Sequence, residues 1–120
     1  MPLNSIGRPS RMRSVYGHNT GTGLEVVYTC PANCVAEVTF IHIINGATSG
    51  STNVDVEWYV AADSYTSHFL HGKSLAHSDY LSFTDIDLVL QPGDRIQVQP
   101  AHAGHLDTII TVTETFNPAS

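Results

Sequence analysis

Apolar and polar residues alternate along much of this chain, and a period of two predicts β-strands with one buried and one solvated face. The alternation is clearest over residues 54–60. One predicted face of that strand carries Val54, Val56, Trp58 and Val60. We expect Trp58 to form the centre of the core, because a buried indole brings more apolar area than any other side chain in this sequence.

A second alternating unit covers residues 85–99. Its apolar positions, which we assign to the core, are Ile86, Leu88, Leu90, Ile96 and Val98. Between the two runs lies Gln91-Pro92-Gly93-Asp94, with proline where φ must be about −65° and glycine where φ must be positive. This is the chemistry of a type II turn, so the unit is predicted to be a β-hairpin at the edge of the core.

Shorter signals predict the remaining strands, and residues 73–79 are expected to be irregular. These strands fall at residues 13–16, 24–29, 35–44, 68–72, 80–83 and 106–116. No stretch of the sequence shows a sustained helical period. The succession of short strands and turns predicts an all-β fold, a single antiparallel β-sandwich or jelly-roll-like domain.

The two ends of the chain differ in charge. Residues 1–22, rich in Gly, Ser, Pro and Asn, are predicted to be an extended N-terminal arm, and residues 23–120 to be the sandwich domain. The arm carries Arg8, Arg11 and Arg13 and no acidic residue, which gives +3. The remainder carries two basic and eleven acidic residues, which gives −9. A basic arm on an acidic body predicts docking on another copy of the chain or on another acidic surface.

In this interpretation the arm makes several weak contacts with a neighbour. The guanidinium groups suit carboxylates on the neighbouring surface. Leu3 and Ile6 are expected to enter apolar pockets there. The alternative is a terminal tail whose charge is incidental.

Composition limits the class of protein. The 120 residues suffice for one domain with its own core, and 42% hydrophobic with 13% charged residues is a globular composition. The net charge of −6 repels phosphate, so nucleic acid is not an expected partner. No apolar run reaches membrane-spanning length, and the first residues lack the apolar core of a signal peptide. We therefore expect a soluble chain, made in the cytoplasm, with no membrane partner.

Two cysteines flank a predicted turn. Cys30 and Cys34 are separated by Pro31-Ala32-Asn33, so their Cα atoms can come within disulfide range. A disulfide within the chain, a disulfide between neighbouring chains and two free thiols all remain open. A zinc site is disfavoured, because C-x3-C is not its usual spacing.

Two histidine pairs have a spacing of three, His68 with His71 and His102 with His105. Residues three apart on a strand face opposite sides, so a pair can share one ion only if it lies in a loop. The loop residues His102 and His105 are thus the better metal candidates, although ordinary surface histidines are the favoured reading. His42, in an apolar strand, is expected in the core or an interface.

Catalytic patterns are missing from the sequence. It contains no G-x-S-x-G, H-E-x-x-H or phosphate-binding glycine loop. Asp85 and Asp87 share one strand face, which is more typical of a solvated face than of an acid pair. We expect neither an enzyme nor a cofactor.

Residues 28–38 read Tyr28-Thr29-Cys30-Pro31-Ala32-Asn33-Cys34-Val35-Ala36-Glu37-Val38. This stretch resembles the YTxPANxxAxV opening of small virion-associated proteins of tailed bacteriophages. Those chains continue through an alternating strand to an L-x-PGD-x-I-x-V hairpin and a final strand of Thr and Val. Here residues 90–98 and 108–115 correspond, so the resemblance covers about residues 24–116. The chain departs from the pattern at its two cysteines, where an apolar or basic residue is usual, and in its arginine-bearing arm.

The resemblance implies a structural protein of a phage particle, located in the virion and made in the host cytoplasm. We expect a capsid decoration (cement) protein that binds the major capsid protein or other virion proteins. A neck, collar or tail accessory protein is an alternative. A carbohydrate-binding module is another, with Tyr59, Tyr65 or Tyr80 stacking on sugar rings.

Self-association is also expected. The predicted strand at 35–44 is rich in apolar residues, including Phe40, Ile41, Ile43 and Ile44. Together with the basic arm, this strand suggests a homo-oligomer. A trimer is favoured, because threefold positions of an icosahedral shell require one and the resembling proteins often supply it.

Overall fold

Two antiparallel sheets form the part of the chain that the computed structural model describes, residues 9–101 and 105–116. The elements in chain order are β1 (Ser10–Asn19), β2 (Glu25–Thr29), β3 (Cys34–Asn45), β4 (Ser51–Val60), the 3₁₀ turn η1 (Ala61–Asp63), β5 (Tyr65–Ala76), β6 (Tyr80–Leu90), β7 (Arg95–Pro100) and β8 (Leu106–Phe116). Within the described residues, no helix has the length and apolarity that crossing a membrane requires.

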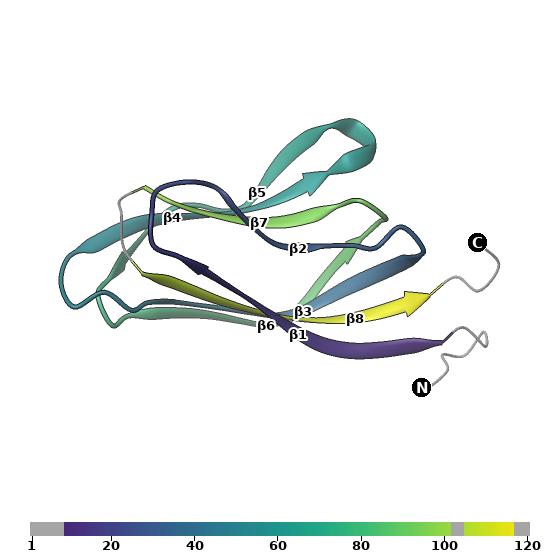
Figure 1. The fold of residues 1–120 in the computed structure, drawn as a ribbon, viewed down its shortest axis with the longest axis horizontal. Helices are drawn as coiled ribbons and strands as arrows, with labels where there is room; N and C mark the ends of the chain where they lie inside the picture. Colours follow the sequence, from purple (N-terminus) through teal and green to yellow (C-terminus); the bar gives the residue numbers. More distant parts are fainter. Residues whose placement is uncertain (1–8, 102–104, 117–120) are drawn as a thin grey trace.

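The strand order is β1-β8-β3-β6 in the first sheet and β2-β7-β4-β5 in the second. The two sheets lie face to face as two layers, with β1 and β8 side by side along one of them (Figure 1). Every neighbouring pair is antiparallel. The predicted all-β sandwich is confirmed.

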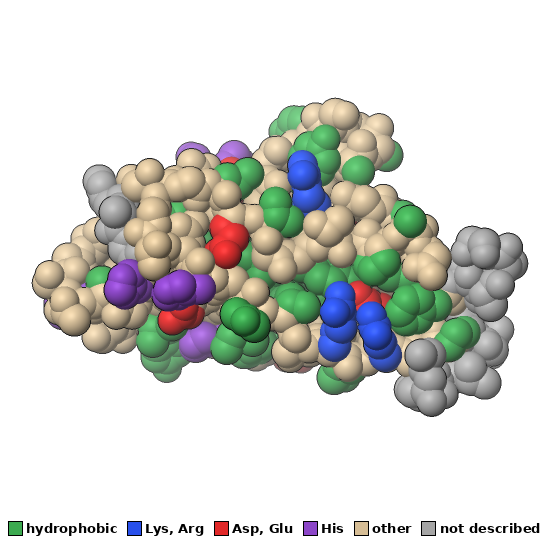
Figure 2. All heavy atoms as spheres, in the orientation of Figure 1, with side chains coloured by type: hydrophobic (Ala, Val, Ile, Leu, Met, Phe, Trp, Pro, Cys, Tyr) green, Lys and Arg blue, Asp and Glu red, His purple; other side chains and the backbone are tan. Residues whose placement is uncertain are grey.

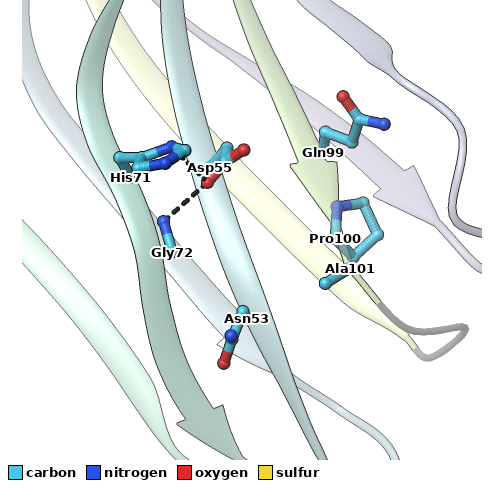
Figure 3. A pocket seen from close by; sticks show the side chains of 7 residues that line it. All are labelled: Asn53, Asp55, His71, Gly72, Gln99, Pro100 and Ala101. Atoms are coloured by element: carbon cyan, nitrogen blue, oxygen red, sulfur yellow. Dashed lines mark hydrogen bonds and ion pairs between the residues drawn. The ribbon is translucent and has the colours of Figure 1, made fainter.

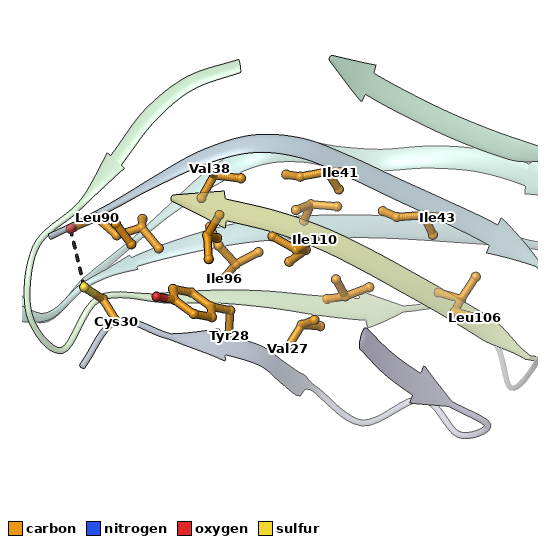
Figure 4. Close-up of a cluster of buried hydrophobic side chains, with 14 of the residues drawn as sticks. Val27, Tyr28, Cys30, Val38, Ile41, Ile43, Leu90, Ile96, Leu106 and Ile110 are labelled. Atoms are coloured by element: carbon orange, nitrogen blue, oxygen red, sulfur yellow. Dashed lines mark hydrogen bonds between the residues drawn. The ribbon is translucent and has the colours of Figure 1, made fainter. Parts of the chain in front are cut away.

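The core fills the space between the sheets, and alternate positions of β3 and β8 supply much of it (Figure 4). An irregularity in β3 between Val38 and Phe40 changes the alternation, so that Ile41 and Ile43 face the core after Val38. The fully buried apolar side chains include Val38, Ile41, Ile43, Leu75, Leu90, Ile96, Leu106 and Ile110.

The predicted core residues divide into two groups. Val54, Val56, Leu90, Ile96 and Val98 have no exposed surface. Ile86 and Leu88 are partly buried and pack against the core, and Val60 is half-buried outside that cluster.

Trp58 lies at the rim of the core and not at its centre, contrary to our expectation. Its indole Nε1–H donates a hydrogen bond to Oδ2 of Asp94 at 3.2 Å. This polar contact holds one edge of the indole at the end of the sandwich, and the smaller branched residues Val54 and Val56 fill the centre instead.

The turn at Gln91–Asp94 has the predicted geometry but joins different sheets. Gly93 has φ +87°, and the Asp94 N–H donates to the Gln91 carbonyl at 3.0 Å. However, β6 belongs to the first sheet and β7 to the second, so the predicted hairpin is wrong. The buried Asp94 carboxylate explains the crossing, because it binds the N–H groups of Gln91 and Ala61 as well as the Trp58 indole.

The predicted boundary of the N-terminal arm also requires correction. Residues 10–19 form strand β1, which pairs with β8 along its whole length and therefore belongs to the sandwich. Val15 packs against the core, and Arg11 and Arg13 contact a buried acidic residue. Three residues assigned to the arm, Leu3, Ile6 and Arg8, lie outside the described residues.

Strand β5 is longer than predicted. The sequence indicated a strand at 68–72 and an irregular segment at 73–79, whereas β5 continues to Ala76. Its pairing with β4 is irregular on both sides of Val56, so glycine and polar residues are accommodated without ending the strand.

Candidate assembly surface

The outer face of the first sheet carries apolar and aromatic side chains in adjacent rows. The register places Tyr16, Ile109, His42 and Ser82 in one row across the four strands. The next rows are Ser14, Thr111, Phe40 and Thr84 on one side, and His18, Asp107, Ile44 and Tyr80 on the other. We call Tyr16, Phe40, His42, Ile44, Tyr80 and Ile109 the outer belt.

The outer belt is accessible to a partner. Tyr16 is 82% exposed, Tyr80 58% and Ile109 42%. Large apolar residues that remain this exposed, on neighbouring strands of one sheet, are typical of protein interaction surfaces. The sequence alone could not identify these residues as exposed. Alternation predicts a strand, but it does not show which of the two faces is buried against the other sheet.

His42 stabilises the middle of the outer belt. Its Nδ1 makes a 2.7 Å hydrogen bond with the Ser82 hydroxyl. Its ring is parallel to that of Phe40, with centroids 6.2 Å apart, and lies 5.4 Å from the ring of Tyr80. His42 was expected in the core or an interface; the structure places it half-buried on the outer face and not in the core, and the interface position stays a prediction. Its ring forms one continuous patch with the rings of Phe40 and Tyr80.

The inner side of β1 contains a charge cluster around Glu114. The Glu114 side chain has no exposed surface. Its Oε1 accepts a 2.7 Å hydrogen bond from Nε of Arg11, and its Oε2 lies 3.3 Å from Nη2 of Arg13 and accepts a 2.5 Å bond from the Tyr28 hydroxyl. Figure 2 shows two basic side chains side by side over an almost covered acidic one at this end of the molecule.

The cluster keeps Glu114 ionised. Burial alone favours the neutral carboxyl, but hydrogen bonds from Tyr28 and Arg11 and the charges of both arginines outweigh it and lower the pKa of Glu114. Burial, followed by the hydrogen bond to Glu114, raises the pKa of Tyr28. Aromatic contacts complete the cluster, since the Arg11 guanidinium lies 5.3 Å from the Phe116 ring and that of Arg13 5.7 Å from the Tyr28 ring.

Arg11 and Arg13 were predicted to bind carboxylates on a neighbour. In the structure both bind Glu114 of their own chain. Arg13 of β1 also contacts the ring of Tyr28 in β2, so it connects these two strands. The sequence could not indicate this pairing. Glu114 lies at an inward-facing position of a Thr-rich strand, and its arginine partners are about a hundred residues away.

Cys30 and Cys34 are both buried, with their Sγ atoms 3.7 Å apart, and both are free thiols in this structure. Burial, followed by the hydrogen bond with Cys34, raises the pKa of Cys30 to about 12. Since neither sulfur reaches the surface, the geometry favours contact within the chain over contact between chains.

Four of the described histidines form two groups. His105 is exposed, with its ring 5.9 Å from that of His18, and His18 pairs with Asp107. The other weak metal candidate, His102, lies outside the described residues. On the second sheet, the rings of His68 and His71 are 4.5 Å apart.

The three tyrosines considered for sugar stacking do not form one platform. Tyr59 is covered by the guanidinium of Arg95, 4.1 Å from its ring centroid. Tyr65 and Tyr80 are exposed, but they belong to β5 and β6, which lie in different sheets.

No protein-family model and no curated protein sequence matches this chain. Solved structures do share its fold. A capsid structure of the Helicobacter pylori bacteriophage KHP30 superposes with a TM-score of 0.54 and 13% identity, over 91% of this chain and 93% of that chain.

Two further structures have a similar fold. A chain of the cyanophage Pam1 capsid superposes with a TM-score of 0.54 and 12% identity, over 97% of this chain and 91% of its own length. A disulfide-linked pilus protein of Bacillus endospore appendages superposes with a TM-score of 0.53 and 10% identity, over 98% of this chain and 97% of its own. These similarities show a shared sandwich fold.

Proposed function

We propose that this chain is a structural protein of a phage particle, which acts by binding other protein subunits and not by catalysis. The observation that carries the proposal is the outer belt, a strip of exposed and half-buried apolar and aromatic side chains that crosses the first sheet. The fold supports it, because phage capsid chains of similar length have the same sandwich. In its finer form, the protein is a capsid decoration protein that forms a homotrimer and binds the shell.

The outer belt replaces the N-terminal arm as the main attachment surface in this proposal. Arg11 and Arg13 both bind Glu114 of their own chain, which uses part of their hydrogen-bonding capacity, although both side chains remain partly exposed. Tyr16 and Ile109, in contrast, are opposite one another on β1 and β8, and no described element covers them. Burying such side chains releases about 25 cal/mol per Å² of apolar surface.

The experiment measures binding to phage particles produced without this protein. Purified full-length chain is mixed with these particles and quantified by co-sedimentation, and electron microscopy then locates it on shell, neck or tail. We expect saturable binding that falls at least tenfold in the double variant Tyr16→Ser, Ile109→Ser. The control is Tyr65→Ser, another exposed tyrosine, on the other sheet.

Both variants replace exposed residues, so circular dichroism and thermal unfolding should match the original protein. Sedimentation equilibrium of the free protein tests the trimer. Failure of the original protein to bind the particles would contradict the proposal, as would equal loss of binding in the Tyr65→Ser control. Binding at the neck or tail would retain the structural role and overturn the decoration role.

A further inference from the structure

Three side chains with metal-binding chemistry converge on the outer face of the β4–β5 pair. Asp55, His68 and His71 each offer one ligand atom, and these atoms lie within 4.8 Å of one another. Oδ1 of Asp55 and Nδ1 of His71 are 3.3 Å apart. Ligand atoms bound tetrahedrally to Zn²⁺ at 2.0–2.2 Å are about 3.3–3.6 Å apart, so one pair is already at the required separation.

Two histidines three positions apart share a face here because β5 is irregular. Leu70 pairs with Val56 and His68 with the next residue, Glu57, so β5 has one extra residue, Phe69, at this point. An extra residue shifts the alternation of side chains by one position. His68 and His71 are therefore brought to the same side, which a regular strand does not permit.

A second irregularity holds Asp55 in place. Asp55 is the single residue of β4 opposite His71 and Gly72, between the pairs Val54–Lys73 and Val56–Leu70. Gly72 has φ +65°, and its N–H donates a 2.6 Å hydrogen bond to Oδ1 of Asp55 (Figure 3). A side chain with Cβ is strained at this φ, so glycine fixes the turn that aims His71 at the carboxylate.

His68 is oriented by a second carboxylate. Its Nε2 lies 3.4 Å from Oε2 of Glu57, and the other carboxylate oxygen, Oε1, accepts a 3.2 Å hydrogen bond from Gln97. Glu57 and Gln97 are both buried. If Nε2 keeps this contact with Glu57, Nδ1 is the nitrogen of His68 that would bind an ion, and such a carboxylate–histidine arrangement is common around metal-bound imidazoles.

The cluster is accessible from solvent. The His71 side chain is 73% exposed and that of His68 43%, whereas that of Asp55 is 26% exposed. His71 and Asp55 also line an open hollow of about 280 Å³, with Asn53 and Gln99 (Figure 3). An ion can therefore enter without any strand separating.

We propose that Asp55, His68 and His71 bind one divalent transition-metal ion of the Zn²⁺ class, with Glu57 positioning His68 and water at the remaining coordination position. Two imidazoles and one carboxylate are a donor set that suits Zn²⁺ and disfavours Ca²⁺ or Mg²⁺, which take oxygen ligands. The ion fastens β4 to β5 and stabilises the hairpin that rises from the second sheet (Figure 1). The site is independent of the outer belt, which lies on the other sheet.

The experiment uses the full-length chain without a polyhistidine tag, stripped of metal with a chelator. Isothermal titration calorimetry with ZnCl₂ should give one ion per chain at micromolar affinity. Co²⁺ in its place should give the visible absorption of a tetrahedral site without a thiolate-to-metal charge-transfer band, which excludes Cys30 and Cys34 as ligands. CaCl₂ and MgCl₂ should give no binding at the same concentrations.

Variants locate the site. His71→Ala and Asp55→Ala should each weaken Zn²⁺ binding at least tenfold. Glu57→Gln removes the charge beside His68 and retains an oxygen that can accept the hydrogen bond from Gln97, and it should weaken binding about 10- to 100-fold. The control is His77→Ala, an exposed histidine outside the cluster, with unchanged affinity. Thermal unfolding in chelator verifies that each variant folds, and added Zn²⁺ should raise the unfolding temperature of the original and the control only.

Three results would overturn the proposal. The first is the absence of Zn²⁺ binding in the micromolar range. The second is unchanged binding in a folded His71→Ala variant. The third is loss of binding in His18→Ala, which would assign the ion to the group formed by His18, His105 and Asp107.

Discussion

Arg11 and Glu114 lie 103 positions apart in the sequence, and their side chains form a 2.7 Å hydrogen bond between Nε and Oε1. The pair joins β1 to β8 on the inner side of the first sheet, where Glu114 is fully buried and Arg11 half exposed. A charge in this position requires partners, because an unpaired buried carboxylate is strongly destabilising.

Replacement of Glu114 by glutamine should therefore destabilise the protein. The variant keeps an oxygen acceptor but loses the charge that both arginines and Tyr28 contact. We expect a decrease of about 2 kcal/mol in the free energy of unfolding, the range for hydrogen bonds to charged groups. Urea unfolding followed by circular dichroism provides the measurement.

The matched control is Asp107→Asn, which removes the exposed pair with His18. It should change the free energy of unfolding by no more than about 0.5 kcal/mol, because exposed ion pairs contribute little. Equal effects of the two variants would show that burial of Glu114 is not what makes its contacts important.

The same carboxyl predicts a pH dependence of stability. Its pKa is lower in the folded state than the ordinary glutamate value of about 4.3, so the unfolded state binds more protons in the acid range. The stabilisation from Glu114 is complete above the ordinary value and is lost as pH falls through the lower value.

Urea unfolding measured from pH 6 down to pH 2 tests this dependence. The free energy of unfolding should fall less steeply with acid in Glu114→Gln than in the original protein. Parallel curves for the two proteins would contradict the lowered pKa.

The cysteines should be unreactive in the folded protein. Both thiols are buried and the pKa of Cys30 is raised to about 12, so little thiolate forms at neutral pH. Protein purified under reducing conditions should release almost no thionitrobenzoate from Ellman's reagent at pH 7.5 until urea unfolds it, and two thiols per chain should then react.

Oxidation provides a second measurement on the same residues. Since the Sγ atoms are 3.7 Å apart and buried, a mild oxidant should produce a monomer band on non-reducing electrophoresis. The short loop limits the stabilisation from such a bond to about 2 kcal/mol. A ladder of multimers would contradict the burial of both sulfurs.

Asp94 should be the most sensitive position of the crossing turn. Its buried carboxylate accepts hydrogen bonds from the Gln91 N–H, the Ala61 N–H and the Trp58 indole. Asp94→Ala leaves all three donors without this partner, and we expect a loss of about 3 kcal/mol in the free energy of unfolding. Trp58 fluorescence should shift to longer wavelength as water reaches the indole.

A control for that prediction is Asp87→Ala, an exposed aspartate on β6. It should leave both the stability and the Trp58 emission unchanged within error. An Asp94→Ala variant as stable as this control would mean that water replaces the carboxylate at no cost.

The sequence predicted the fold class well because period-two alternation is a local signal. It marked the final strand at residues 106–116 and the start of β6 correctly. The prediction of a hairpin at residues 85–99 was wrong. The sequence pattern of a type II turn is the same whether the two strands that it joins pair with each other or enter different sheets. That choice depends on Asp94 and its contacts with Trp58 and Ala61, which no local pattern encodes.

The N-terminal strand was predicted too short, at residues 13–16 against residues 10–19 in the structure, for a different reason. In β1 the polarity is inverted, since Arg11 and Arg13 face inward while Met12 and Tyr16 face solvent. Inward-facing arginines are explained only by their contacts with the buried Glu114. The cluster of His68 and His71 was not predicted either. An extra residue in β5 brings both side chains to one face of the strand, and the spacing of residues in the sequence does not reveal such an irregularity.

The position of β8 between β1 and β3 has a consequence for how the chain folds during synthesis. While the ribosome is still translating residues 106–116, β1 has no neighbour in its sheet and β3 pairs on one side only. The nascent chain must therefore keep two incomplete strand edges away from other chains until β8 emerges. Chaperone dependence of the newly made protein should follow from this single feature of strand order.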